Sequence, residues 1–180
     1  MATLEIVQPE IIQFEFRQEK TDPDYGNCMW ATFRIDTKNY DLMIMSDCGN
    51  YAYGWHITPT ESFLHLLSRL DEGYLLEKLS SQTVVDAEAT LSSIKKLIAD
   101  YGCEDEVQPD WDEIEGACVS RNGFEVVAGL MDLFKGTEME NCDIGDIYNC
   151  IEIDYPTRAK KIVEIFEQYV APKCKELEEH

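Results

Sequence analysis

The N-terminal third of the chain alternates hydrophobic and polar residues in short runs that are separated by turn-forming residues. Alternation of this kind puts every second side chain on one face of a strand. The connections between the runs are short, and short connections join antiparallel neighbours. The pattern therefore predicts a four-stranded antiparallel meander with one face left for helices to cover. The predicted strands are Ile11–Arg17, Met29–Asp36, Asp41–Ser46 and Tyr51–His56.

The last two predicted strands are joined by the turn Asp47–Asn50. Gly49 and Asn50 both tolerate positive φ, which tight hairpin turns require, so we place the tip of the hairpin at these two residues. Asp22 and Asp24 occur in a loop segment typical of an ordinary turn. We therefore expect these loop carboxylates to form turns and not a metal site.

After Thr60 the hydrophobic pattern changes to the period of a helix. Residues 84–101 carry a clear apolar stripe that ends at Gly102, and we expect this helix to lie on the sheet. A long helix follows Pro156, and Pro172 should kink or interrupt it because proline lacks a backbone N–H. Shorter helices are predicted near residues 62–70, 111–114 and 123–135.

Together these elements predict an α+β fold. A chain of 180 residues is long enough for one sizeable domain. We expect the antiparallel sheet and its covering helices in residues 1–102, followed by an acidic helical C-terminal half in residues 103–180. We predict that the two halves pack as one domain.

The charge of the chain restricts its partners. It has 36 acidic and 15 basic residues, a formal net charge of −21. Such a chain repels phosphate backbones, so direct binding of nucleic acid is disfavoured. The negative electrostatic field of such a chain attracts basic surfaces, including the grooves in which other proteins hold nucleic acid. High charge also serves solubility alone, and that explanation stays open.

An acidic run surrounds one tryptophan. The run is typical of a solvated loop or of a helix start, with Asp110 as a possible cap. The alternative is a patch that binds a protein partner, with the tryptophan as the apolar anchor and the carboxylates meeting lysine or arginine. The candidate partner-binding residues are Glu104, Asp105, Glu106, Asp110, Trp111, Asp112, Glu113 and Glu115.

Catalytic candidates are few. The chain has three histidines and no common nucleotide-binding or hydrolase motif, which favours a binding protein over an enzyme. If the protein were a nuclease, Asp47 and His56 would be the catalytic candidates. We expect no cofactor and no metal. The stripe of Tyr51, Tyr53 and Trp55 on one strand face could stack bases, but the negative charge favours a core face covered by helices.

The seven cysteines are scattered and contain no CxxC pair, so we expect reduced, mostly buried thiols and no cysteine chemistry. No apolar run is long enough to span a membrane. The N-terminal residues lack the pattern of a secretory signal. We therefore expect the protein in the cytosol.

The hairpin region resembles a module of small, uncharacterised proteins encoded by bacteriophages and prophages. The resemblance rests on Asp-x-Gly-Asn-Tyr-x-Tyr-x-Trp within Ser46–Trp55, followed by Phe63-Leu64 and by Tyr74–Leu79. The module often has an aromatic residue where this chain has Cys48. The resemblance implies a phage protein that acts in the cytosol of a host cell as an accessory factor against host defence. Such accessory factors include anti-CRISPR proteins.

These observations lead to one preferred hypothesis and two alternatives. We expect a phage counter-defence protein, an anti-CRISPR inhibitor, whose acidic surface occupies the basic nucleic-acid channel of a CRISPR effector or another basic host protein. The first alternative is a small nuclease or modifying enzyme that inactivates a nucleic-acid component of host defence. The second is a structural or assembly factor of the virion.

Overall fold

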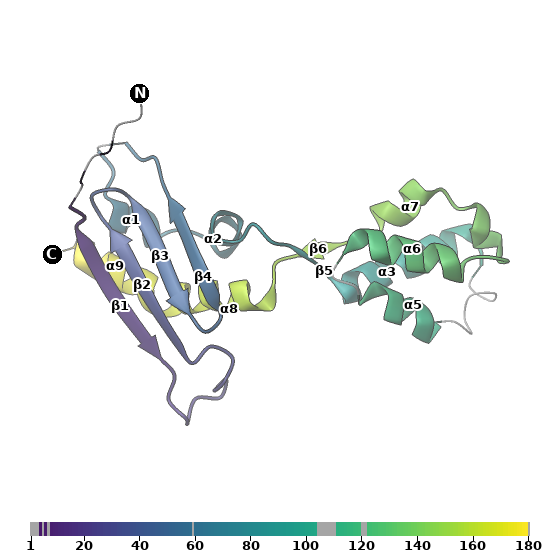
Figure 1. Cartoon of the computed structure of the whole chain (residues 1–180), viewed down its shortest axis with the longest axis horizontal. Helices are drawn as coiled ribbons and strands as arrows, with labels where there is room; N and C mark the ends of the chain where they lie inside the picture. Colours follow the sequence, from purple (N-terminus) through teal and green to yellow (C-terminus); the bar gives the residue numbers. More distant parts are fainter. Residues whose placement is uncertain are drawn as a thin grey trace. The chain divides into compact units, whose positions relative to one another are not determined.

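The computed structural model describes Leu4, Ile6 and residues 8–58, 60–103, 111–119 and 122–179. By their internal contacts, the residues divide into two compact units (Figure 1). The first, the sheet unit, consists of Met1–Ser81 and Tyr155–His180, and the second, the helical unit, is Gln82–Asp154. The helical unit is therefore inserted, along the chain, between two parts of the sheet unit.

The sheet unit contains the predicted four-stranded antiparallel meander. Its strands are β1 (Ile11–Arg17), β2 (Trp30–Asp36), β3 (Asp41–Ser46) and β4 (Gly49–Gly54), in the order β1-β2-β3-β4. Together with the helices that follow, this sheet confirms the α+β prediction.

The tip of the β3–β4 hairpin differs from the prediction. Ser46 pairs with Gly49, so the two residues of the tip are Asp47 and Cys48, and Asn50 already belongs to β4. Gly49 has a φ of 125°, which other residues rarely adopt. The sequence pattern correctly located a hairpin but placed its tip two residues too late.

Helices cover one face of the sheet (Figure 1). They are α1 (Phe63–Leu67), α2 (Glu72–Leu79), α8 (Thr157–Ile165), the π-helical turn η3 (Phe166–Val170) and α9 (Ala171–Glu178). Alternate residues of β2 and β3 face these helices, as the binary pattern predicts. The core that results includes Phe33, Ile35, Leu42, Ile44, Leu67, Leu75 and Phe166, each no more than 1% exposed.

Pro172 explains the π-helical turn in the C-terminal helix. A proline cannot donate a backbone hydrogen bond to the residue four positions before it. The turn before it widens, so that the Ala171 N–H donates to the Phe166 carbonyl, five residues back. The predicted interruption is therefore a π turn, after which the helix continues as α9.

The helical unit has its own core. Its elements are β5 (Val84–Val85), α3 (Ala87–Tyr101), α5 (Trp111–Cys118), α6 (Gly123–Leu133), the 3-10 turn η2 (Glu138–Asn141), α7 (Ile144–Asn149) and β6 (Ile153–Asp154). β5 pairs with β6 close to the two points where the chain enters and leaves the unit. The fully buried core side chains include Ile94, Ile98, Ile114, Val126, Leu130 and Phe134.

α3 packs differently from our prediction. The Asp86 carboxylate caps its first turn, and Gly102, with a φ of 71°, ends it as predicted. However, Ile94 and Ile98 of α3 belong to the core of the helical unit, where α3 packs on α5, α7 and η2. The contacts thus divide the chain after Ser81 and after Asp154, whereas the sequence suggested a boundary at residue 102.

Candidate functional site

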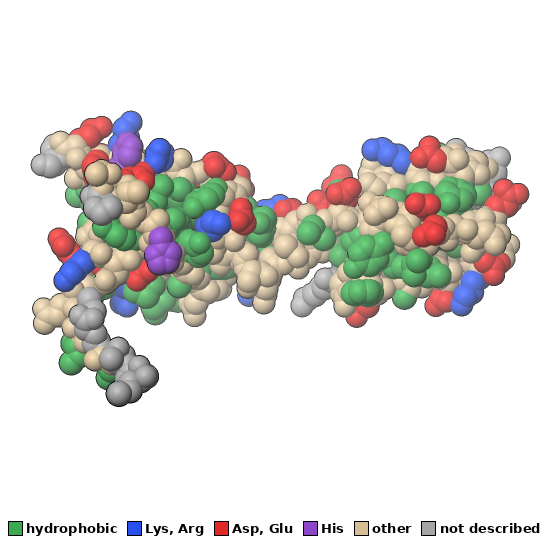
Figure 2. All heavy atoms as spheres, turned by 90° about the horizontal axis from the view of Figure 1, so that it is seen from above, with side chains coloured by type: hydrophobic (Ala, Val, Ile, Leu, Met, Phe, Trp, Pro, Cys, Tyr) green, Lys and Arg blue, Asp and Glu red, His purple; other side chains and the backbone are tan. Residues whose placement is uncertain are grey.

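The acidic residues are divided equally between the two units, but the basic residues are not. The helical unit has 18 acidic and 4 basic residues, a formal charge of −14. The sheet unit has 18 acidic and 11 basic residues, a formal charge of −7. The smaller unit therefore carries two thirds of the net charge. On the face shown in Figure 2, its acidic side chains are spread among hydrophobic ones.

The structure describes only the last part of the predicted acidic patch, at the start of α5. Glu104, Asp105, Glu106 and Asp110 lie outside the described residues. Asp112, Glu113 and Glu115 are exposed on α5, and these three carboxylates lie within about one turn of this short helix.

Trp111 contributes to both the core and the surface. Its side chain is half-buried and packs against the core of the helical unit. The Lys95 Nζ of α3 lies 5.3 Å from the centre of its ring, a cation–π contact. Part of the ring is thus held within the unit, and part remains at the surface beside the α5 carboxylates.

The helical unit also exposes an aromatic pair that the sequence analysis missed. Phe124 is 71% exposed and Tyr148 is 45% exposed, and their ring centres are 5.6 Å apart in an edge-to-face arrangement. Phe124 lies in the first turn of α6, and Tyr148 lies on α7. Exposed aromatic residues within a charged surface are typical of protein-binding sites.

Asp47 has a structural role at the hairpin tip. Its carboxylate accepts hydrogen bonds from the backbone N–H groups of Met29 at 3.0 Å and Trp30 at 3.3 Å. Burial alone would raise the pKa of Asp47, but these hydrogen bonds outweigh burial and lower the pKa below its ordinary value. Asp47 therefore fastens the segment that precedes β2 to the hairpin.

The two catalytic candidates of the nuclease alternative are not brought together. Asp47 lies at the tip of the β3–β4 hairpin, whereas His56 follows the opposite end of β4. The six residues of β4 between them span about 20 Å in an extended strand. A proton transfer requires contact at hydrogen-bond distance or through one water, so the pair cannot act on one reacting group.

The aromatic residues of the phage-like module support the fold. The Tyr51 hydroxyl donates to the Cys48 carbonyl at 3.0 Å, and the Trp55 ring N–H donates to the Tyr74 hydroxyl at 3.2 Å. Tyr53 packs edge-to-face on Trp55 with ring centres 4.7 Å apart. All three stripe residues pack against the core of the sheet unit, as the core-face interpretation predicts.

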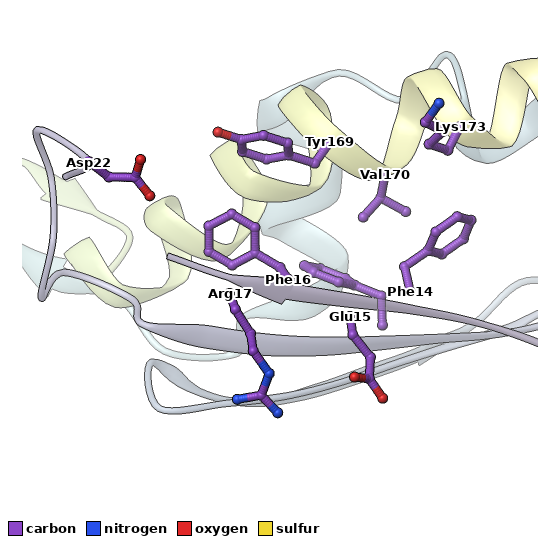
Figure 3. A pocket seen from close by; sticks show the side chains of 9 residues that line it. Phe14, Glu15, Phe16, Arg17, Asp22, Tyr169, Val170 and Lys173 are labelled. Atoms are coloured by element: carbon purple, nitrogen blue, oxygen red, sulfur yellow. The ribbon is translucent and has the colours of Figure 1, made fainter. Parts of the chain in front are cut away.

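A hollow of about 450 Å³ lies between β1 and the C-terminal helix (Figure 3). Phe14, Phe16 and Tyr169 face into it, and the rings of Phe16 and Tyr169 lie 5.1 Å apart. Glu15 and Arg17 lie on the other face of β1 and point away from these rings. The polar groups around the hollow do not converge, as they would in a catalytic or ligand pocket.

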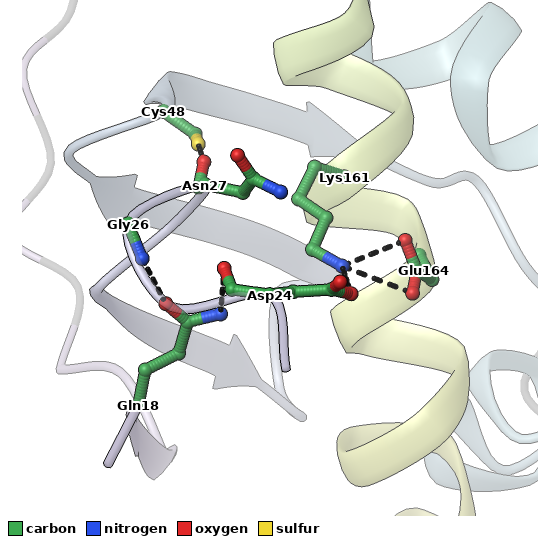
Figure 4. Close-up of polar contacts among 7 residues, drawn as sticks. All are labelled: Gln18, Asp24, Gly26, Asn27, Cys48, Lys161 and Glu164. Atoms are coloured by element: carbon green, nitrogen blue, oxygen red, sulfur yellow. Dashed lines mark hydrogen bonds and ion pairs between the residues drawn. The ribbon is translucent and has the colours of Figure 1, made fainter. Parts of the chain in front are cut away.

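The loop between β1 and β2 is fixed by polar contacts (Figure 4). Lys161 of α8 pairs with Asp24 at 3.1 Å and with Glu164 at 3.0 Å. The Gln18 side chain donates to the Asp24 carbonyl and accepts from the Gly26 N–H. Asp24 thus has a structural partner, consistent with the turn interpretation.

The cysteines are reduced and buried, as predicted, but two of them lie together with Asp47. Cys28, Asp47 and Cys48 have side-chain ligand atoms that all lie within 4.8 Å of one another. The Cys48 Sγ donates to the Asn27 carbonyl at 2.8 Å. This cluster escaped the sequence analysis because Cys28 and Cys48 are far apart in the chain and carry no short-spaced motif.

Comparison with known proteins places the chain in a family without assigning an activity. No helix among the described residues combines the length and apolar character that crossing a membrane requires. Searches of curated proteins and of solved structures gave no match. A family model with the description "Phage family" matches residues 11–176, nearly the whole chain. The chain therefore belongs to this family of phage proteins.

Proposed function

We propose that this phage protein is an accessory counter-defence factor that binds a basic, nucleic-acid-binding surface of a host protein through its helical unit. The concentration of charge carries the proposal: 18 acidic residues face only 4 basic ones in that unit. The specific form that we propose is an anti-CRISPR inhibitor, which competes with nucleic acid for the channel of a CRISPR effector. In this role the protein inhibits by occupancy and not by catalysis.

Electrostatics favours a protein partner over nucleic acid. At most 4 of the 18 acidic residues of the helical unit can be neutralised one-to-one by its own basic residues. The remaining negative field repels phosphates and attracts a surface rich in lysine and arginine. Such a field accelerates encounter and selects the sign of the partner, and salt screens it.

Two aromatic features of the helical unit provide apolar contact area for such a complex. Trp111 is partly exposed beside Asp112, Glu113 and Glu115. The exposed Phe124 and its aromatic neighbour form a second apolar surface on α6 and α7. Aromatic side chains within a charged rim carry much of the binding energy in many protein interfaces, and arginine stacks well on their faces.

The test is a titration of CRISPR effector ribonucleoproteins with the full-length protein, with target cleavage and guide integrity followed on denaturing gels. We expect loss of cleavage near one-to-one stoichiometry with an intact guide, and weaker inhibition as salt is raised. A shortened guide at substoichiometric protein would instead show an enzyme. Inhibition that is independent of ionic strength would contradict the electrostatic mechanism.

Charge variants locate the binding surface. The triple substitution Asp112→Asn, Glu113→Gln and Glu115→Gln removes three charges from α5, and we expect at least a tenfold loss of affinity. The matched control removes three exposed charges from the sheet unit with Glu15→Gln, Glu19→Gln and Glu72→Gln. An equal loss in both variants would assign the effect to net charge and not to the helical unit.

A further inference from the structure

Two cysteines and an aspartate meet at one end of the sheet. Cys28 precedes β2, and Asp47 and Cys48 form the tip of the β3–β4 hairpin. The pairing of Ala31 with Ser46 places the two segments side by side. The ligand atoms of the three side chains lie within 4.8 Å of one another. We propose that Cys28, Asp47 and Cys48 bind a divalent cation of the zinc class.

The types of the donor atoms select the metal. Two thiolates and one carboxylate suit Zn²⁺, which binds sulfur and oxygen ligands, whereas Mg²⁺ and Ca²⁺ prefer sites made entirely of oxygen. Three protein ligands with one position open to water is an arrangement that zinc accepts. The site is therefore a zinc-class site and not the oxygen-only site that loop aspartates would form.

The spacing of the donors fits one small ion. Bonds of about 2.3 Å to sulfur and about 2.0–2.2 Å to oxygen put tetrahedral ligands roughly 3.5 Å apart. The Cys28 Sγ lies 3.5 Å from the Asp47 carboxylate. The short backbone segments that carry the donors are held by the ladder and by the Asp47 hydrogen bonds, so small side-chain movements complete the site.

Two of the three proposed ligands are shielded from solvent. Cys28 is fully buried and Cys48 is 4% exposed, whereas Asp47 is exposed and gives the ion a route from solvent. Without the metal, the thiols donate weak hydrogen bonds to Asp47 and to the Asn27 carbonyl. As each sulfur–metal bond forms, the thiol releases its proton to solvent, and no electrons are transferred.

The bound ion would tie the β1–β2 loop to the hairpin. Cys28 lies near the C-terminal end of that loop, which Lys161 and Gln18 already fix through Asp24 and Gly26 (Figure 4). A metal that binds only the folded protein stabilises it by mass action. The expected consequence is a higher thermal midpoint of the sheet unit when one equivalent of zinc is present.

The other cysteines provide internal controls. Among the described residues, the group of Cys28, Asp47 and Cys48 is the one in which three potential ligands lie this close. Cys118 is also fully buried but lies in the helical unit. Cys118→Ser therefore tests the loss of a buried thiol without touching the proposed site.

The experiment is a titration of the reduced full-length protein with Co²⁺, a spectroscopic substitute for zinc, followed by displacement with Zn²⁺. We expect one equivalent of Co²⁺ to give sulfur-to-cobalt charge-transfer absorption in the near ultraviolet and the visible bands of tetrahedral cobalt. Cys28→Ser and Cys48→Ser should each lower the affinity at least about tenfold. Asp47→Asn should also weaken binding while it retains the charge-transfer bands, and Cys118→Ser should match the parent protein.

Three results would overturn the proposal. The first is the absence of charge-transfer absorption in the folded parent protein. The second is an unchanged spectrum in the double variant Cys28→Ser, Cys48→Ser, which would assign the cobalt to other thiols. The third is a disulfide between Cys28 and Cys48 that persists under reducing conditions. Circular dichroism of each variant separates loss of a ligand from loss of the fold.

Discussion

The two units of the chain contain the same number of acidic residues but differ in how these residues are balanced. Eleven basic residues accompany the eighteen acidic ones in the sheet unit, against four in the helical unit. In the sheet unit, Asp36 and Asp47 bind backbone N–H groups and Asp24 pairs with Lys161. These three carboxylates hold turns and loops in place.

Some acidic residues of the helical unit also hold parts of the fold, but the charge of this unit is less balanced. Asp86 and Asp143 cap helices, but the α5 carboxylates are exposed on a short helix. Side chains of one sign on a small unit repel one another and lower its stability. A charge distribution that costs stability is easier to understand where it serves binding, which is why the difference between the units supports the proposed function.

The largest expected effect shows whether the two units unfold separately. Phe166→Ala removes most of a fully buried side chain and leaves a cavity in the core of the sheet unit, and Ile98→Ala does the same in the helical unit. We expect each to lower the free energy of unfolding of its own unit, by about 4 and about 3 kcal/mol respectively. Native-state hydrogen exchange measures the effect residue by residue.

The same experiment tests the domain organisation. If each substitution lowers protection only in its own unit, the chain contains two cooperative units. If Phe166→Ala lowers protection equally in both, the chain folds as the single domain that the sequence pattern predicts. Leu177→Ala, at a half-exposed position of α9, is the control and should have a much smaller effect.

The second prediction contrasts a buried aspartate with an exposed one. Asp36 is 4% exposed and accepts hydrogen bonds from Lys38, Asn39 and Glu10. Asp36→Ala leaves these donors unpaired, so we expect a loss of about 3 kcal/mol. Asp143→Ala removes only the cap of α7 in the helical unit, for about 1 kcal/mol. Urea unfolding measures both losses, and equal losses would contradict the contrast.

Asp36 also makes the stability of the sheet unit depend on pH. Burial by itself would raise its pKa, but the hydrogen bonds from Asn39, Lys38 and Glu10 lower it below the ordinary value of 3.8. As the pH falls, the unfolded chain therefore takes up the proton first. The contribution of Asp36 is fully present well above pH 3.8 and is lost as the pH falls through the folded pKa. Asp36→Ala should lack this part of the acid transition.

The sheet could be predicted from the sequence because period-two alternation specifies both the strand and its buried face. The elements on which α3 packs could not be predicted, because an apolar stripe on a helix shows which face is buried but not what covers that face. The hairpin tip was missed for a local reason. Gly49 has a positive φ, but it follows the two-residue tip and is not part of it. The sequence shows that a glycine is present in the turn, but it does not show which position of the turn the glycine occupies.

The candidate sites also differ in how far the sequence alone predicts them. The acidic run was visible because its residues are consecutive in the chain. The cluster of Cys28, Asp47 and Cys48 was not, because only the register of β2 with β3 brings its parts together. Phe124 and Tyr148 are far apart in the chain, and only the folded structure shows that both are exposed and that their rings are in contact.

A third prediction concerns ionic strength. Because salt screens repulsion between exposed charges, raising it from low to physiological values should stabilise the helical unit by about 1 kcal/mol. The sheet unit, with half the net charge on a longer stretch of chain, should gain less. Hydrogen exchange at two salt concentrations measures both. Equal gains in the two units would show that the uneven charge has no energetic consequence.

The smallest predicted effect tests repulsion inside the less acidic unit. Burial, together with the charges of Glu72 and Asp71, raises the pKa of Glu167 above its ordinary value. Because the folded pKa is raised, the ionised side chain lowers stability at neutral pH, and this cost disappears as the pH falls through the folded pKa. Glu167→Gln should therefore stabilise the protein by about 0.5 kcal/mol at pH 7 and have no effect in acid. The control Glu164→Gln loses the ion pair with Lys161 and should not stabilise the protein. Thermal unfolding of both variants at pH 7 and in acid measures the two effects. Equal stabilisation by both variants would assign the effect to the loss of a negative charge and not to repulsion at Glu167.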